Sequence, residues 1–126
     1  MDITLFIDNL TNILLSYRVL IIGKAACGKT VLMKKIIEGV QKDYKNVIYL
    51  EDLIKATEYN DETKTFLFID EIRKYNEKND ISQILNLKKN RLLCTAQEIN
   101  DSDYTYFDYI LELEKYNNLR EKKPLL

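Results

Sequence analysis

The stretch Gly23-Lys24-Ala25-Ala26-Cys27-Gly28-Lys29-Thr30 is the most informative part of this sequence. It has the pattern G-x-x-x-x-G-K-[ST], and two of the three glycines in the chain fall within it. It follows the apolar run Val19–Ile22 and precedes a segment with helical periodicity, so it joins a buried strand to a helix. Glycines let successive backbone N–H groups point at phosphate oxygens, and the helix start adds free N–H groups. We therefore predict that this loop binds ATP.

Each residue of this stretch has a predicted contact with the nucleotide. Lys29 is expected to reach the β- and γ-phosphates, and the Thr30 hydroxyl is expected to bind Mg²⁺. Cys27 allows two interpretations, a redox switch on ATP binding or a small side chain that fills a permissive position of the motif. The predicted ATP-binding residues of the motif are Gly23, Lys24, Ala25, Ala26, Cys27, Gly28, Lys29 and Thr30.

A second motif lies about 40 residues downstream. The apolar run Phe66–Ile69 is followed directly by Asp70 and Glu71. Asp70 is placed to bind Mg²⁺, directly or through water. In an extended strand Glu71 would point to the opposite side, where it could orient and deprotonate a water molecule that attacks the γ-phosphate. We therefore predict Asp70 and Thr30 as metal ligands and Glu71 and Lys29 as catalytic residues.

The remaining sequence predicts strands that alternate with helices. This pattern is typical of βαβ units and of a mostly parallel sheet. A charged tail over residues 114–126 is predicted to be flexible. The predicted strands are 19–22, 47–50, 66–69, 91–95 and 107–113, and the predicted helices are 2–17, 30–44, 51–57 and one that starts at residue 79 or 80.

Composition excludes several kinds of function. The 126 residues, 46% of them hydrophobic, suffice for one domain over residues 1–126. The formal net charge of −1 does not suit a protein that coats DNA, and the absence of histidine excludes histidine-based metal sites and catalytic triads. Asp2, Asp8 and Asn9 interrupt the N-terminal apolar stretch, so no membrane span or signal peptide is predicted and a cytoplasmic protein is expected.

With these two motifs, residues 18–113 resemble the additional-strand catalytic-glutamate class of P-loop ATPases, which includes AAA+, RecA-like and FtsK/HerA-like groups. The resemblance implies a three-layer α/β/α P-loop NTPase whose five-stranded sheet has the order 5-1-4-3-2. It also implies that Thr95 or Gln97, at the end of the inserted strand 91–95, senses the γ-phosphate. The Thr-x-Gln ending is similar to the FtsK/HerA-like group, which includes many viral DNA-packaging motors. If the protein is viral, it would act inside the host cell.

The same resemblance implies a homo-oligomer in which an arginine acts on the neighbouring subunit's nucleotide. Arg73 and Arg120 are the candidates, although a solvated surface role is open for both. Short basic clusters, such as Lys34-Lys35, either contact nucleic acid or form solvated helix faces. Three functions are therefore considered: an oligomeric ATPase motor or switch that acts on nucleic acid, a nucleotide-dependent binding module with little hydrolysis, and a small-molecule kinase. The kinase ranks lowest because no lid is expected in this sequence.

Overall fold

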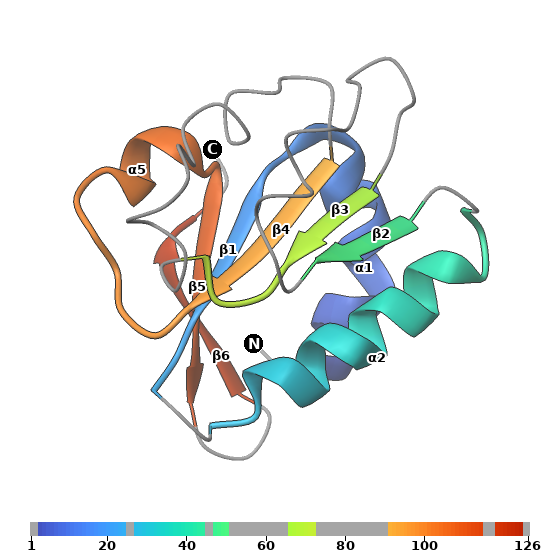
Figure 1. The fold of residues 1–126 in the computed structure, drawn as a ribbon, viewed down its shortest axis with the longest axis horizontal. Helices are drawn as coiled ribbons and strands as arrows, with labels where there is room; N and C mark the ends of the chain where they lie inside the picture. Colours follow the sequence, from blue (N-terminus) through green and yellow to red (C-terminus); the bar gives the residue numbers. More distant parts are fainter. Residues whose placement is uncertain are drawn as a thin grey trace.

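The computed structural model describes residues 3–24, 27–44, 47–50, 66–72, 91–114 and 118–124. Figure 1 shows one sheet that is partly covered by helices. Two predicted helices, over residues 51–57 and from residue 79 or 80 onward, lie outside the described residues.

The sheet has six strands in the order β2-β3-β4-β1-β5-β6. Read from β5, the parallel strands follow the sequence β5-β1-β4-β3-β2, and β6 pairs with β5 in the antiparallel direction. The prediction of a five-stranded sheet with the order 5-1-4-3-2 therefore needs correction, because β6 is added outside β5. The strands are β1 (Val19–Ile22), β2 (Val47–Leu50), β3 (Phe66–Ile69), β4 (Arg91–Ala96), β5 (Tyr109–Glu114) and β6 (Asn118–Lys123).

The prediction of a flexible tail over residues 114–126 is wrong for Asn118–Lys123, which form strand β6. Leu119 is fully buried and lies opposite Leu113 of β5, so one apolar contact fixes the strand to the core. The charged residues that suggested a flexible tail instead pair across the two strands. Arg120 approaches Glu112 at 2.8 Å, and the Tyr109 hydroxyl donates to Glu121 at 2.9 Å. Burial of the hydroxyl raises the pKa of Tyr109 above its ordinary value, and the hydrogen bond to Glu121 raises it by a smaller amount.

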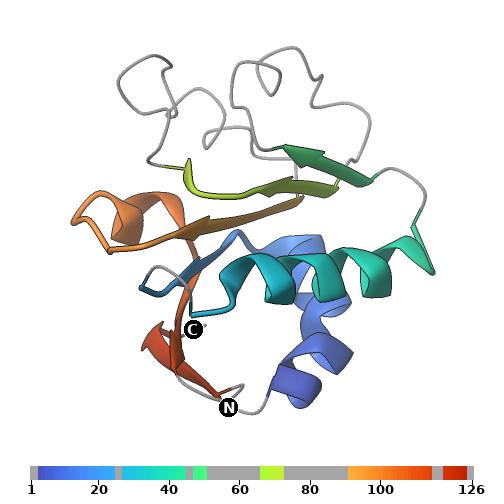
Figure 2. The ribbon, with the colours of Figure 1, turned by 60° about the horizontal axis from the view of Figure 1, so that its bottom comes forward.

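Helices α1 (Ile3–Ser16) and α2 (Lys29–Gln41) form where the apolar residues recur at helical spacing. Both pack on the same face of the sheet, which we call the α1/α2 face (Figures 1 and 2). α2 begins at Lys29, one residue earlier than predicted, and ends three residues before the predicted Tyr44. The buried side chains through which the two helices join the core are Phe6, Leu10 and Leu14 of α1 and Leu32, Met33, Ile36 and Val40 of α2.

The opposite face has a second cluster of buried side chains. Side chains along β1, β3 and β4 point alternately to the two faces of the sheet, and both faces are buried. Each of these strands therefore contains a continuous apolar run in the sequence. The short helix α5 (Asp103–Tyr106) was not predicted. Its last turn ends where the Phe107 N–H donates to the Asp103 carbonyl, and Phe107 then enters this second cluster. β5 therefore starts at Tyr109 rather than at the predicted residue 107.

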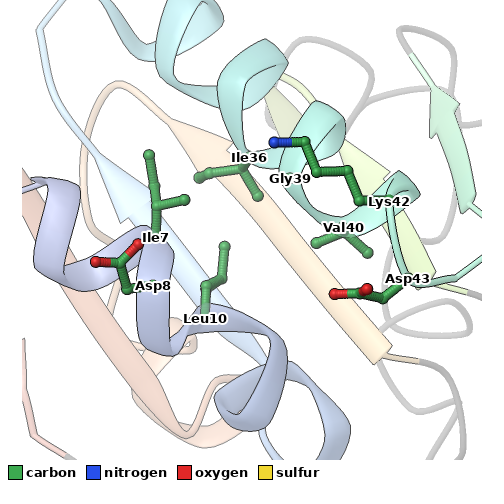
Figure 3. A pocket seen from close by; sticks show the side chains of 8 residues that line it. All are labelled: Ile7, Asp8, Leu10, Ile36, Gly39, Val40, Lys42 and Asp43. Carbon is green, nitrogen blue, oxygen red and sulfur yellow. The ribbon is translucent and has the colours of Figure 1, made fainter.

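A hollow lies between α1 and the C-terminal half of α2 (Figure 3). Gly39 lies at its floor, where the position of an added Cβ would be 3.7 Å from Ile7. This distance is an ordinary van der Waals contact, so α1 lies directly beside this position of α2. Within the part of the chain that the structure describes, no helix is long and apolar enough to cross a membrane.

The docking of β6 can be tested with Leu119→Ala. Removing a fully buried leucine leaves a cavity, so we expect the free energy of unfolding in urea to fall by about 2 to 5 kcal/mol. Leu5→Ala is the matched control, because Leu5 is 57% exposed and its truncation should change stability little. Equal unfolding midpoints for both variants would show that β6 is not part of the folded core.

Candidate functional site

The carboxyl ends of three neighbouring parallel strands bring the two predicted motifs together. Ile69 at the end of β3 lies opposite Cys94 of β4, and Ile22 at the end of β1 lies opposite Ala96. The Gly23 N–H also donates to the Ala96 carbonyl at 3.1 Å. Because parallel strands end at one edge of the sheet, the residues after β1 and β3 meet there, as ligand-binding residues of open α/β sheets commonly do.

Asp70 is the centre of a group of hydroxyl side chains. The Thr95 hydroxyl donates to its Oδ1 at 2.5 Å, and the Thr30 hydroxyl donates to its Oδ2 at 3.0 Å. The Tyr49 hydroxyl donates to the same Oδ2 at 3.2 Å. Asp70 is only 8% exposed, so these three donors replace the water that the carboxylate loses on burial. They come from β4, α2 and β2, and they hold the carboxylate between these elements.

The Lys29 ammonium lies in the loop that precedes α2. Its Nζ donates to the Gly23 carbonyl at 2.5 Å and to the Lys24 carbonyl at 3.0 Å. Lys29 is 5% exposed, and the two carbonyls accept from two of the three N–H groups of this buried ammonium. Gly28, directly before the helix, has φ +100°, a left-handed conformation that favours glycine. The backbone therefore turns at Gly28 so that α2 starts with the lysine facing back into the loop.

Cys27 packs inside this loop. Its Sγ lies 3.8 Å from the Lys29 Nζ, and a Cβ placed on Gly23 would come within 2.5 Å of the same sulfur. A side chain at residue 23 would therefore displace the Cys27 sulfur from its present position. A small side chain at residue 27 suits this packing, while the redox interpretation stays a prediction.

Glu71 does not continue the extended strand that its predicted orientation assumed. β3 ends at Ile69, and Glu71 has φ +53°, which is unusual for a residue other than glycine. Its N–H donates to the Thr95 hydroxyl at 2.9 Å, and its carboxylate lies 3.6 Å from the Lys29 Nζ. The assumption of an extended strand at Glu71 was wrong, and the turn brings its side chain toward Lys29. Backbone conformations of this kind cluster at functional sites.

This arrangement can be compared with known protein families. A family model described as "Poxvirus A32 protein" matches residues 7–122 and so covers both motifs, strands β1 to β5, most of α1 and all of β6 but its last residue. The chain belongs to the poxvirus A32 protein family. None of the curated proteins compared with it gives a significant match.

Some predicted site residues of this A32-family chain are not among the buried side chains of the site, and others lie outside the described residues. Lys24 is exposed, as is Gln97, which lies just beyond the end of β4. Ala25, Ala26 and Arg73 lie outside the described residues. The Thr95 hydroxyl bonds to Asp70 and to the Glu71 N–H, and its predicted role as a phosphate sensor stays a prediction.

Tyr49 is the site residue that the sequence did not suggest. It is half-buried near the end of β2 and lies opposite Phe68 of β3, two residues before Asp70. Side chains alternate along a strand, so Phe68 and Asp70 share a face, and Tyr49 shares it with them. The strand register would have revealed this contact, but the sequence alone does not give the register.

The oxygen atoms of Thr30 and Asp70 fit Mg²⁺. The ion prefers carboxylate, hydroxyl and water oxygens, and these two side chains already lie in hydrogen-bond contact. Among the described residues no three acidic or cysteine side chains gather into a metal cluster. Thr30 and Asp70 are the described residues that would hold a Mg²⁺ ion, and the ion would supply positive charge beside a bound phosphate.

The hydrogen bonds of the Thr95 hydroxyl in the A32-family chain can be tested with Thr95→Val. This change removes the hydroxyl from a site that is 1% exposed and leaves the Glu71 N–H and one Asp70 oxygen without that partner. We expect the free energy of unfolding to fall by about 1 to 3 kcal/mol, as measured by urea denaturation. Thr95→Ser keeps the hydroxyl and is the control. If the valine variant is as stable as the serine variant, the two hydrogen bonds do not stabilise the fold.

Proposed function

We propose that this A32-family protein binds Mg-ATP on residues 23–30 and hydrolyses it. The observation that carries the proposal is the 3.0 Å hydrogen bond between the Thr30 hydroxyl and the Asp70 carboxylate. These residues are 40 positions apart, and each stands at the place where its motif predicts a magnesium ligand. The family is associated with ATPase activity and DNA packaging, which supports the same conclusion.

In this proposal each side chain has a separate task. Thr30 and Asp70 hold Mg²⁺, which neutralises phosphate charge when it is bound. Lys29 leaves the carbonyls of Gly23 and Lys24 and binds the β- and γ-phosphates. Its movement would separate it from the Glu71 carboxylate, which lies 3.6 Å away in the present arrangement.

Glu71 is the proposed general base. Its carboxylate orients a water molecule and accepts the proton as the water oxygen forms a bond to the γ-phosphorus. The bond between that phosphorus and the bridging oxygen breaks, and ADP leaves with the electron pair. The close approach of Glu71 to Lys29 supports this assignment, because it places the carboxylate beside the group that would bind the transferred phosphate.

We further propose that the protein belongs to the additional-strand catalytic-glutamate ATPases and works as an oligomer on DNA inside the host cell. The support is the family membership together with the position of β4 between β3 and β1, which is where that class carries its inserted strand. Thr95 and Gln97 at the end of β4 would then report the state of the γ-phosphate.

The catalytic assignment can be tested with Glu71→Gln and Lys29→Ala. We expect Glu71→Gln to bind a fluorescent ATP analogue as wild type does and to release phosphate about 10² to 10⁴ times more slowly, since it lacks only the base. Lys29→Ala should weaken nucleotide binding about 10- to 100-fold, because it loses a charge-assisted contact. Glu38→Gln, at an exposed position of α2, is the matched control and should behave as wild type.

The same measurement separates hydrolysis from binding alone. If wild type binds nucleotide but releases no phosphate above a protein-free blank, the protein is a nucleotide-dependent binding module. If wild type hydrolyses ATP and Glu71→Gln does so equally fast, Glu71 is not the base. If wild type does not bind the nucleotide, both assignments are wrong.

The oligomeric part of the proposal has its own test. We expect native mass spectrometry to show a larger assembly with Mg-ATP than without it, and phosphate release to rise when duplex DNA is added. Glu71→Gln should assemble in the same way but release little phosphate. A wild-type protein that stays monomeric and whose turnover is unaffected by single-stranded or duplex DNA would contradict an oligomeric motor on DNA.

A further inference from the structure

Tyr49 contacts the proposed magnesium site from a strand that carries neither motif. Its hydroxyl donates to Asp70 Oδ2 at 3.2 Å, and Thr30 donates to this same oxygen. Tyr49 also packs against the buried cluster under α2, so its ring is held by apolar neighbours while its hydroxyl reaches the carboxylate. A tyrosine has only two side-chain torsions to order, which suits a residue that must present one oxygen at a fixed place.

The hydrogen bonds at Asp70 divide between its two oxygens. Oδ1 accepts from Thr95, and Oδ2 accepts from Thr30 and Tyr49. A carboxylate has about four acceptor positions, so three donors fix its plane and leave about one position for another ligand. Without Tyr49, the bond from Thr30, itself a predicted metal ligand, would be the one that Oδ2 keeps among the described residues. Thr95 would then be the remaining hydrogen-bond donor to the carboxylate from outside the metal site, within the part of the chain that the structure describes.

We propose that Tyr49 is a positioning residue that holds the Asp70 carboxylate in place for Mg²⁺, and so determines how much Mg²⁺ the protein needs to bind nucleotide. The inference rests on the proposed function, because it requires that Asp70 serve the metal of Mg-ATP. Tyr49 itself touches neither nucleotide nor reacting atoms in this assignment. It acts through Asp70, as hydrogen-bond partners of metal ligands commonly do.

The test compares Tyr49→Phe with wild type by titrating Mg²⁺ into the protein with a fluorescent ATP analogue. Partners of metal ligands typically change metal affinity 10- to 100-fold, and a 3.2 Å hydroxyl–carboxylate bond is long. We therefore expect the half-saturating Mg²⁺ concentration to rise about tenfold. Binding of the analogue in excess EDTA should not change, because Lys29 and the loop backbone are intact.

Tyr44→Phe is the matched control. It makes the same chemical change on a tyrosine whose ring contacts Phe66, with centroids 4.8 Å apart, and it should leave the Mg²⁺ requirement as in wild type. A double-mutant cycle with Asp70→Asn shows whether Tyr49 acts through that carboxylate. In the Asp70→Asn background, Tyr49→Phe should cause no further change in the Mg²⁺ requirement.

Three results would overturn the inference while leaving the proposed function intact: an unchanged Mg²⁺ requirement in Tyr49→Phe, an equal loss of binding with Mg²⁺ and with EDTA, or independent effects of the two substitutions in the cycle. The equal loss includes the case in which Tyr49→Phe fails to fold, which circular dichroism would detect. A wild-type protein that binds no nucleotide, or binds it without regard to Mg²⁺, would instead reject the proposed function, and the inference with it.

Discussion

The burial of the Asp70 carboxylate is the constraint on which the arrangement of the site depends. A carboxylate that is 8% exposed must find hydrogen-bond donors within the protein, and here each donor is a hydroxyl from a different element. To satisfy Asp70, the first turn of α2, the end of β2 and the end of β4 must all approach the end of β3. The same group that the proposed chemistry assigns to the metal is therefore also the point where four elements are joined.

Thr95 shows how this constraint extends to Glu71. Its hydroxyl donates to Asp70 and accepts from the Glu71 N–H, so it fixes the backbone just where the chain leaves β3. The left-handed turn at Glu71 follows and directs the carboxylate to Lys29. One buried hydroxyl thus links the proposed metal ligand to the proposed base. A change at Thr95 is expected to affect both, and so its effects on stability and on chemistry are coupled.

The sequence predicted the parts of this site that depend on local pattern. The strand–loop–helix around residues 23–30 and the acidic end of β3 follow from glycines, apolar runs and helical periodicity, and the structure places both at one edge of the sheet. The contact of Tyr49, the turn at Glu71 and the pairing of β6 depend on strand register and on residues far apart in the chain. β6 was missed because its six residues have a single apolar anchor, Leu119, and its charges find partners only once β5 is beside it.

The pairing of β6 also changes the argument about a trans-acting arginine. Arg18 precedes β1 and Arg91 starts β4, so both lie at the edge of the sheet opposite the site. Arg120 lies opposite Glu112, which in turn lies opposite Ile22, the last residue before the loop. Its ion pairs with Glu112 and Glu114 are exposed and stabilise by at most about 1 kcal/mol, so in the proposed oligomer they would oppose a contact with a neighbouring subunit's phosphate only weakly. Of the arginines that the structure describes, Arg120 is thus the one whose strand register places it at the edge of the sheet where the proposed phosphate site lies.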